Sequence, residues 1–108
     1  MSDQKEDTAD SSEWKTLWGA LVKQPCRMPH GVLKMLIERM KSELNAASGK
    51  LQEEGLKIVE RVKLEADKTF GGHWHIVLGR NFGCHTTHDA DHFAFFSVDG
   101  VAVLAFRT

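Results

Sequence analysis

Residues 74–106 read WHIVLGRNFGCHTTHDADHFAFFSVDGVAVLAF, and this stretch decides the fold. β-Branched and aromatic residues, which favour strands, gather in four runs. The runs are Trp74–Leu78, Phe82–Thr87, Phe93–Val98 and Val101–Phe106. Gly79, Asp89-Ala90-Asp91 and Asp99-Gly100 separate them, and Asp-Gly is typical of a two-residue hairpin turn because both central positions need a positive φ. The stretch therefore predicts a meander of antiparallel strands with short connections.

The last two runs carry apolar residues on both faces of the predicted sheet. Successive side chains point to opposite faces of a strand, so Phe95 and Phe96 fall on different faces, as do Val103 and Leu104. A sheet with one face in water should instead alternate apolar and polar residues. Two helices can cover only one face, so we infer that a second copy of the chain covers the other.

Two helices are predicted upstream of these strands. The first begins at Met28-Pro29, because proline is tolerated at the first helical position, and ends near Gly49. The second runs from about Lys50 to Thr69, and Gly71-Gly72 releases the chain into the sheet. Apolar stripes at helical spacing support both: Leu33, Leu36, Ile37, Met40 and Leu44, then Leu51, Gly55, Ile58, Val59, Val62 and Ala66. The fold class is α+β, with two helices packed on a small antiparallel sheet.

The first 23 residues divide into a tail and an ambiguous segment. Residues 1–13 are polar without an apolar period and are predicted to be a disordered tail, which leaves one domain over residues 14–108. Trp14, Leu17, Trp18 and Leu21 recur at helical spacing. Alternatively, Gly19 breaks that helix and Ala20–Lys23 forms an edge strand. Trp14 and Trp18 either fold back over the helices or anchor a partner.

The composition fits a small globular domain and excludes several classes of protein. Hydrophobic residues make up 42% and charged residues 27%, and the formal net charge of −1 gives no basic surface for nucleic acid or membranes. The chain has no run of about 18 apolar residues and no signal-peptide pattern. Cys26 and Cys84 do not suggest a disulfide framework. We expect a protein of the reducing cytoplasm, with no nucleic-acid and no membrane partner.

A set of motifs in the strand region resembles the small dynein light chain family. The matching residues are Trp74-His75, Gly79-Arg80-Asn81-Phe82-Gly83, Thr87-His88, His92-Phe93, and Val101-Ala102 with Phe106. They run without a gap across roughly the last third of the chain. The helical half fits the family in pattern and only loosely in residue identity. In the family a short first strand falls near Ala20, which favours an edge strand there after one short helical turn.

The resemblance implies a strand-exchanged homodimer that binds peptides. In the family, the strand matching Phe82–Thr87 crosses to the partner's sheet, and its free edge binds short linear motifs in a groove at the dimer interface. The peptide-binding residues carried over are Asn81, Phe82, Gly83, Cys84, His85, Thr86, Thr87, His88, Phe93 and Phe95. The dimer-interface residues carried over are His75, Phe82, Cys84 and Thr87. From the pattern alone, the alternative is an edge that pairs only with the partner and stays closed.

This chain departs from the family at several positions. His85 stands where an aromatic residue is usual and Thr86 where a branched aliphatic residue is usual. A basic residue and a carboxylate that hold the motif's glutamine in the family fall on Leu56 and Gly55, and neither can do that. Either Glu53, Glu54 or Lys57 substitutes for them, or the chain does not bind the usual motif. With its N-terminal extension, the chain looks more like a divergent or axonemal member of the family than like the common cytoplasmic hub.

The five histidines between residues 73 and 92 invite a metal hypothesis. His73 and His75 share a strand face, but His85 and His88 fall on opposite faces, and no second cysteine lies near Cys84. We therefore predict no metal site. His75 matches a histidine packed at the family's dimer interface. Its protonation, near the usual histidine pKa of about 6.5, is expected to weaken the dimer.

No catalytic constellation is predicted. Cys84 and His85 are adjacent and point to opposite faces of a strand, so His85 is a poor base for the thiol. The chain has neither a glycine-rich phosphate loop nor a nucleophile elbow, and Asp89-Ala90-Asp91 lacks the full calcium-loop signature. We expect no enzyme activity and no cofactor.

By resemblance, the predicted function is that of a non-catalytic light chain of the dynein microtubule motor. It would bind segments of the dynein intermediate chain or of other clients by β-strand addition. The alternative is a dimeric hub that acts independently of the motor. The expected location is the cytoplasm and cytoskeleton, with a cilium or axoneme left open.

Overall fold

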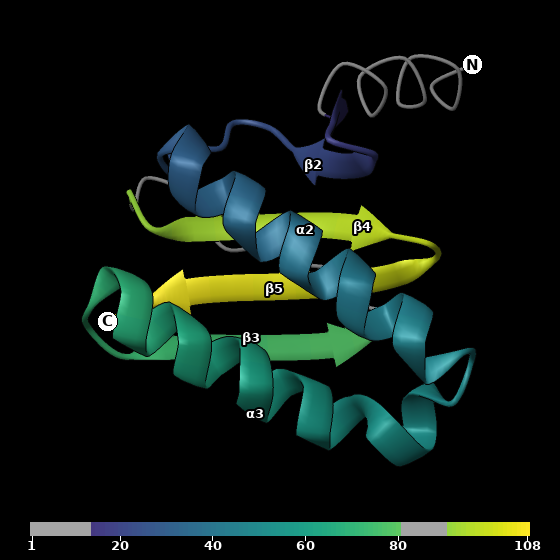
Figure 1. Cartoon of the computed structure of the whole chain (residues 1–108). Helices are drawn as coiled ribbons and strands as arrows, with labels where there is room; N and C mark the ends of the chain where they lie inside the picture. The colour runs from purple at the N-terminus through teal and green to yellow at the C-terminus, as the bar shows by residue number, and fades with distance from the viewer. Residues whose placement is uncertain (1–13, 81–90) are drawn as a thin grey trace, which may run out of the picture.

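The computed structural model describes residues 14–80 and 91–108. Its elements are β1 (Trp14–Leu17), β2 (Ala20–Lys23), α2 (His30–Ala47), α3 (Leu51–Phe70), β3 (Trp74–Gly79), β4 (Phe93–Val98) and β5 (Val101–Arg107). The strands form a five-stranded sheet in the order β1-β2-β4-β5-β3, with every neighbouring pair antiparallel. Both helices cross the same face of this sheet (Figure 1). The predicted α+β class, two helices on a small antiparallel sheet, is confirmed.

Two parts of the prediction lie outside the described residues. They are the tail over residues 1–13 and the strand Phe82–Thr87. Three predicted strands are confirmed, with β3 and β5 each one residue longer than expected. The hairpin turn between β4 and β5 is also confirmed, because Asp99 and Gly100 have φ values of 51° and 80°.

The predicted meander is wrong in its strand order. β3 pairs with β5 rather than with the strand that follows it, so β5 lies between β3 and β4. Both β3 and β4 are antiparallel to β5 and therefore run parallel to each other. A short turn cannot join parallel strands. Residues 80–92 connect the end of β3 to the start of β4. The turn signals in the sequence did not reveal that these two strands are parallel.

The N-terminal segment forms a hairpin, so the predicted helical turn before Ala20 is wrong. β1 pairs with β2 through a turn at Trp18-Gly19, where φ is 49° and 83°. Lys41 Nζ donates a hydrogen bond of 3.0 Å to the Trp18 carbonyl, which holds this uncommon backbone conformation. Ala20–Lys23 is a strand as expected, but β1 takes the edge and β2 lies inside the sheet.

Both predicted helices are confirmed to within a few residues. α2 follows Pro29 and ends at Ser48 and Gly49, which have left-handed φ values of 51° and 82°. α3 ends at Gly71, whose N–H donates to the Asp67 carbonyl. The buried part of each stripe faces the sheet: Leu33, Leu36, Ile37 and Met40 from α2, and Ile58, Val62 and Ala66 from α3.

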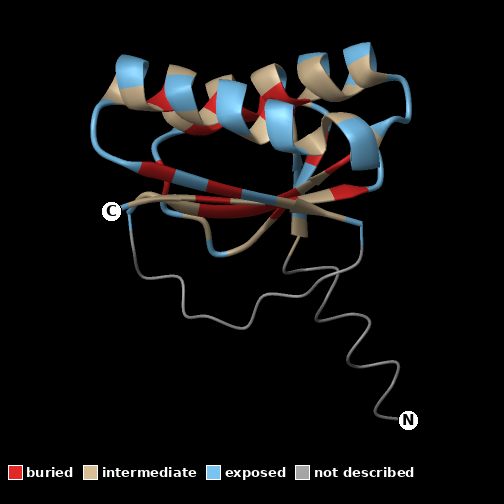
Figure 2. Ribbon diagram, turned by 90° about the horizontal axis from the view of Figure 1, so that it is seen from below, coloured by how far each residue is buried: buried red, intermediate tan, exposed pale blue. Residues whose placement is uncertain are grey.

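Trp74 fastens the second helix to the sheet. Its side chain is fully buried, as expected for a core residue, and its indole Nε1–H donates 3.1 Å to the Gly71 carbonyl. Its backbone N–H donates 2.8 Å to the Asp67 carboxylate, which also accepts from Lys63 Nζ. The buried residues form one layer between the helices and the sheet (Figure 2).

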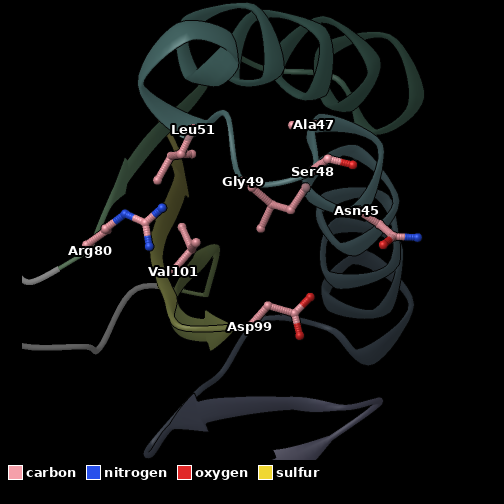
Figure 3. A pocket seen from close by; sticks show the side chains of 9 residues that line it. Asn45, Ala47, Ser48, Gly49, Leu51, Arg80, Asp99 and Val101 are labelled. Atoms are coloured by element: carbon pink, nitrogen blue, oxygen red, sulfur yellow. The ribbon is translucent and has the colours of Figure 1, made fainter.

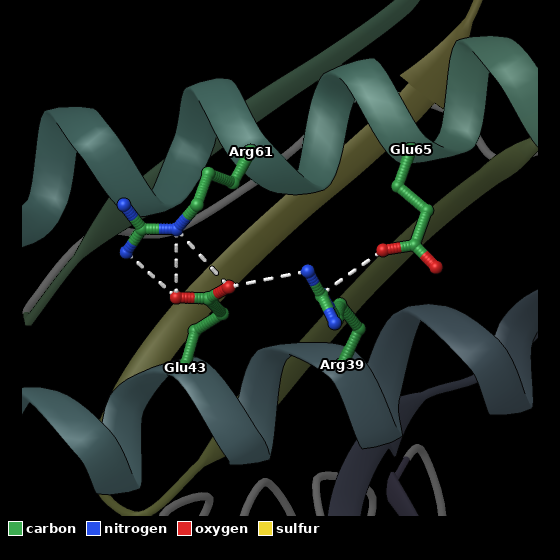
Figure 4. A network of polar contacts seen from close by, with 4 residues as sticks. All are labelled: Arg39, Glu43, Arg61 and Glu65. Carbon is green, nitrogen blue, oxygen red and sulfur yellow. Dashed lines mark hydrogen bonds and ion pairs between the residues drawn. The ribbon is translucent and has the colours of Figure 1, made fainter.

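A charged network joins the outer sides of the helices (Figure 4). The Arg61 guanidinium donates to Glu43 at 2.7–3.2 Å, and Arg39 lies 3.5 Å from Glu43 and 3.0 Å from Glu65. The Glu43 side chain is only 12% exposed, so the two arginines replace much of its water. The hydrogen bond from Arg61 holds the pKa of Glu43 below its usual value, against the opposing effect of burial.

These contacts predict that the fold loses stability in acid. The hydrogen bond from Lys63, and then that from the Trp74 N–H, lowers the pKa of Asp67, as Arg61 does for Glu43. A carboxylate whose folded pKa lies below its unfolded value of about 4 stabilises the fold above that value. This contribution is lost as the pH falls through the folded pKa.

We expect the free energy of unfolding, measured by urea denaturation, to fall as the pH drops below about 4 to 5. Glu43→Gln and Asp67→Asn should each lower stability at neutral pH and flatten this acid dependence. Glu60→Gln, at an exposed position of α3, is the control and should leave the dependence unchanged. An equally steep acid profile in the two variants would contradict the assignment.

Candidate functional site

The sheet face that the helices leave uncovered is apolar. Register places His75, Phe106 and Phe93 in one row across β3, β5 and β4, and Val77, Leu104 and Phe95 in the next. Figure 2 shows both helices on the opposite side of the sheet. Val77 is 46% exposed, and Leu21 of β2, on the same face, is 48% exposed. We call this surface the helix-free face. Exposed apolar surface of this kind marks an interaction site.

Stacked rings order the helix-free face. The His75 ring stacks on Phe106 at 4.9 Å between centroids, and Phe106 stacks on Phe93 at 6.2 Å. His75 Nε2 also lies 3.1 Å from the Thr108 hydroxyl oxygen. Trp14 of β1 lies 5.9 Å from Phe95, with Lys23 Nζ 5.5 Å from the Trp14 ring centroid. Aromatic rings in contact with one another therefore form much of this face.

A groove runs between the first half of α3 and the end of β3, and we call it the α3–β3 groove. It encloses about 500 Å³ and is mostly apolar. Its lining residues are Leu51, Gln52, Gly55, Leu56, Val59, Leu78, Gly79 and Arg80. Leu56 is 81% exposed, the highest value among the exposed large hydrophobic residues of the described chain. The groove lies at the edge of the sheet, because β3 pairs only with β5 among the described strands.

A second cavity, of about 290 Å³, lies at the end of the molecule where the turn between α2 and α3 meets the β4–β5 hairpin (Figure 3). Arg80 and Asp99 line it, together with Leu44, Asn45, Ala47, Ser48, Gly49, Leu51 and Val101. It shares Leu51 and Arg80 with the α3–β3 groove. Its lining is more polar and it does not follow a strand edge, so it is the weaker candidate.

Only part of the predicted site lies within the described residues. Asn81, Phe82, Gly83, Cys84, His85, Thr86, Thr87 and His88 lie outside them. Phe93 and Phe95, predicted to bind peptide, and His75, predicted at the dimer interface, all lie on the helix-free face. Leu78 and Val59 of the groove were not predicted as site residues, since at helical and strand spacing they were indistinguishable from core. Gly55 and Leu56 were noted only as departures from the family.

The structure also locates the other candidate residues. Among residues 14–80 and 91–108, no three His, Cys, Asp or Glu side chains are placed to hold a metal ion. Cys26 is a free thiol whose burial raises its pKa, with Sγ 3.9 Å from the Phe93 carbonyl oxygen. Asp91 pairs with Arg27 at 3.6 Å. Neither helix in the described part of the chain is long and apolar enough to cross a membrane.

The sequence of the chain matches a known protein family. The family model for dynein light chain type 1 matches residues 21–108. The chain belongs to the dynein light chain family. This family is non-catalytic, and its members have structural or adaptor roles. Family members generally form dimers and bind dynein components or other client peptides.

Individual relatives support the assignment at different levels. The chain is 39% identical over 51 residues to the cytoplasmic dynein light chain 1 of Saccharomyces cerevisiae. That match covers 47% of this chain and 55% of the yeast protein, so the chain aligns with about half of its relative's length.

Solved structures match the fold over a longer span. The dynein light chain-like domain of the Fasciola hepatica calcium-binding protein FhCaBP2 has a TM-score of 0.72 at 22% identity, covering 87% of this chain and 96% of that domain. The corresponding domain of CsTAL3 has a TM-score of 0.70 at 21% identity, covering 87% and 97%. At these identities the likeness concerns the fold alone.

Proposed function

We propose that the chain forms a homodimer that acts as a light chain of the dynein microtubule motor complex. In this role it holds extended segments of the dynein intermediate chain, or of other clients, by β-strand addition. The observation that carries the proposal is the pairing of an apolar helix-free face with a sheet edge at β3 that has no outer neighbour in the described chain. Membership of the dynein light chain family points in the same direction.

The helix-free face supports the dimer. Leu104 at its centre and Val77 beside it offer an apolar patch flanked by the stacked rings of His75 and Phe106, whereas Phe95 on the other side lies against Trp14 and is only 6% exposed. If the same face of a second copy covers this patch, the burial stabilises the dimer by about 25 cal/mol for each Å² of apolar area removed from water. A symmetric pair also satisfies both copies at once.

The β3 edge supports strand exchange. Its outward N–H and C=O groups can pair with the predicted strand Phe82–Thr87 of the partner, which in turn presents its own free edge to a client segment. Asn81, Cys84, His85, Thr86, Thr87 and His88 are proposed to contact that client, as are Phe93 and Phe95 of the helix-free face. Two equivalent grooves make the dimer bivalent, so the second site gains from effective concentration.

The proposed location is the cytoplasm and cytoskeleton, and the name of the yeast relative calls it cytoplasmic. An axonemal or ciliary dynein is the narrower version of the same proposal. The second candidate is a dimeric hub independent of the motor, which uses the same groove for other clients. Residues 1–13 are proposed to be a tail outside the domain.

A charge at Leu104 should disrupt the proposed dimer. Leu104→Glu places an unpaired charge in the proposed interface and should weaken dimerisation about a hundredfold or more, measured by sedimentation equilibrium. Leu64→Glu, at an exposed position on α3, is the control and should leave the dimer intact. Circular dichroism of both variants checks the fold. A monomeric wild-type chain at high concentration would overturn the proposal.

The proposed dimer should weaken as the pH falls. His75 lies on the face that the partner is proposed to cover, so its protonation would bury a charge between the copies. The dimer dissociation constant should rise as the pH falls from about 7.5 to about 5.5. His75→Gln should abolish this rise. A wild-type dissociation constant that does not change over this range would contradict the prediction.

Client binding can be measured with short peptides. An array of linear peptides that includes dynein intermediate-chain segments should identify binders, and Gly83→Trp should remove their binding by blocking the proposed strand edge. Thr87→Ala should weaken it less. Binding confined to peptides unrelated to dynein would favour the hub. An array without any binder would contradict peptide binding altogether.

A further inference from the structure

We propose that a notch at Gly55, beside Leu56 on α3, makes the α3–β3 groove select a client segment by an apolar side chain. This inference rests on the proposed function and specifies its client: an extended peptide with a large aliphatic or aromatic residue at the position opposite Gly55 and Leu56.

The glycine itself is the first observation. Gly55 lies in the interior of α3, where glycine lowers helix stability relative to alanine. Packing within the chain does not require a glycine here, because an added Cβ would meet only Leu51 Cδ1, at the ordinary contact distance of 3.7 Å. The φ angle of Gly55 is not positive, so the backbone conformation does not require a glycine at this position either. The missing side chain instead opens the wall of the groove to an incoming chain.

The residues that line the α3–β3 groove favour an apolar side chain on the client. Leu56 exposes 81% of its surface next to Gly55, and Val59, Leu51 and Leu78 continue the apolar wall. Gln52 and Arg80 contribute the polar groups. An amide or carboxylate on the client would therefore lose water against apolar walls without gaining enough partners. An apolar side chain gains the burial of its own surface and that of Leu56.

The position of the groove argues for a peptide as its occupant. The groove lies beside the edge of β3, where the partner's strand is proposed to add, so a client segment on the free edge of that strand would run as an extended chain alongside α3. Arg80 at one end has neither a hydrogen bond nor an ion pair in the described part of the chain. Its charge favours a segment with an acidic residue next to the apolar one. Glu53, Glu54 and Lys57 do not line the groove, so its described walls carry no carboxylate that would repel the acidic residue.

Gly55→Ala separates folding from binding. The substitution should raise Tm by about 4 °C or more, because alanine favours the helix. It should weaken binding of a peptide selected from the array about tenfold, because the new methyl group fills the notch. Gly31→Ala is the matched control: Gly31 is also helical, an added Cβ there meets nothing within 4 Å, and it lies outside the groove. It should leave the affinity unchanged. An unchanged affinity for Gly55→Ala would overturn the inference.

Leu56→Lys tests the preference directly. On a position-scanning peptide array, the wild-type chain should prefer an apolar residue at one position, and the variant should prefer an acidic residue at that position only. Leu64→Lys, on the same helix and 59% exposed, should leave the profile as in the wild type.

The outcomes distinguish the inference from the function on which it rests. Wild-type binding with a glutamine or other polar preference at every position, or a profile unmoved by Leu56→Lys, overturns the inference and leaves peptide binding standing. No peptide bound by the wild-type chain means that the proposed function itself fails. Weakened dimerisation in Gly55→Ala, with peptide affinity of the remaining dimer unchanged, means that the partner copy fills the notch and also overturns the inference.

Discussion

Two helices cover one face of a five-stranded sheet whose strands are apolar on both faces, and the rest of the structure depends on this constraint. The helices and the inner face form a closed core around Trp74, Phe96 and Ile37, each 1% exposed or less. Nothing in the described residues closes the other face to the same degree, where Val77 remains 46% exposed. A chain of 108 residues has little stability to spare, so leaving such a surface in water is costly. Association is the direct physical remedy.

The sheet has two edges, and the chain treats them differently. At one edge, β1 closes against β2, and the turn at Trp18-Gly19 is fastened to α2 by Lys41. Trp14 of that strand folds onto Phe95 and so covers part of the helix-free face within its own chain. At the other edge, β3 has β5 on one side and the α3–β3 groove beside it. This asymmetry supports β3 as the edge for the proposed strand addition, since the opposite edge is the short strand β1, which carries Lys15.

The sequence predicted the parts of the fold that local chemistry determines. The Asp99-Gly100 turn, the two helical stripes and the glycines beyond each helix were all readable, because each depends on neighbouring residues. The order of the strands was not, because pairing β3 with β5 depends on a return over residues 80–92 that no turn signal encodes. The N-terminal hairpin was misread in part, because Trp18 lies in a left-handed turn although the apolar residues around it match helical spacing. These residues are Trp14, Leu17, Trp18 and Leu21.

In the site, Leu78 and Val59 were indistinguishable from core by spacing alone. The bare face, by contrast, was predicted from the absence of polar alternation in β4 and β5.

In the proposed assembly, folding, dimerisation and client binding become one linked equilibrium. A ligand that binds only the associated state stabilises that state by mass action. A client bound across strands of both copies would therefore tighten the dimer, and dimerisation would tighten client binding by the same factor. Gly55 then illustrates a conflict between levels. For the isolated helix alanine is better, and the local cost of glycine is repaid only when another chain enters the groove. A residue that weakens its own element, contacts nothing that requires it, and lines an apolar groove at a sheet edge is more readily explained by what binds there than by the fold that carries it.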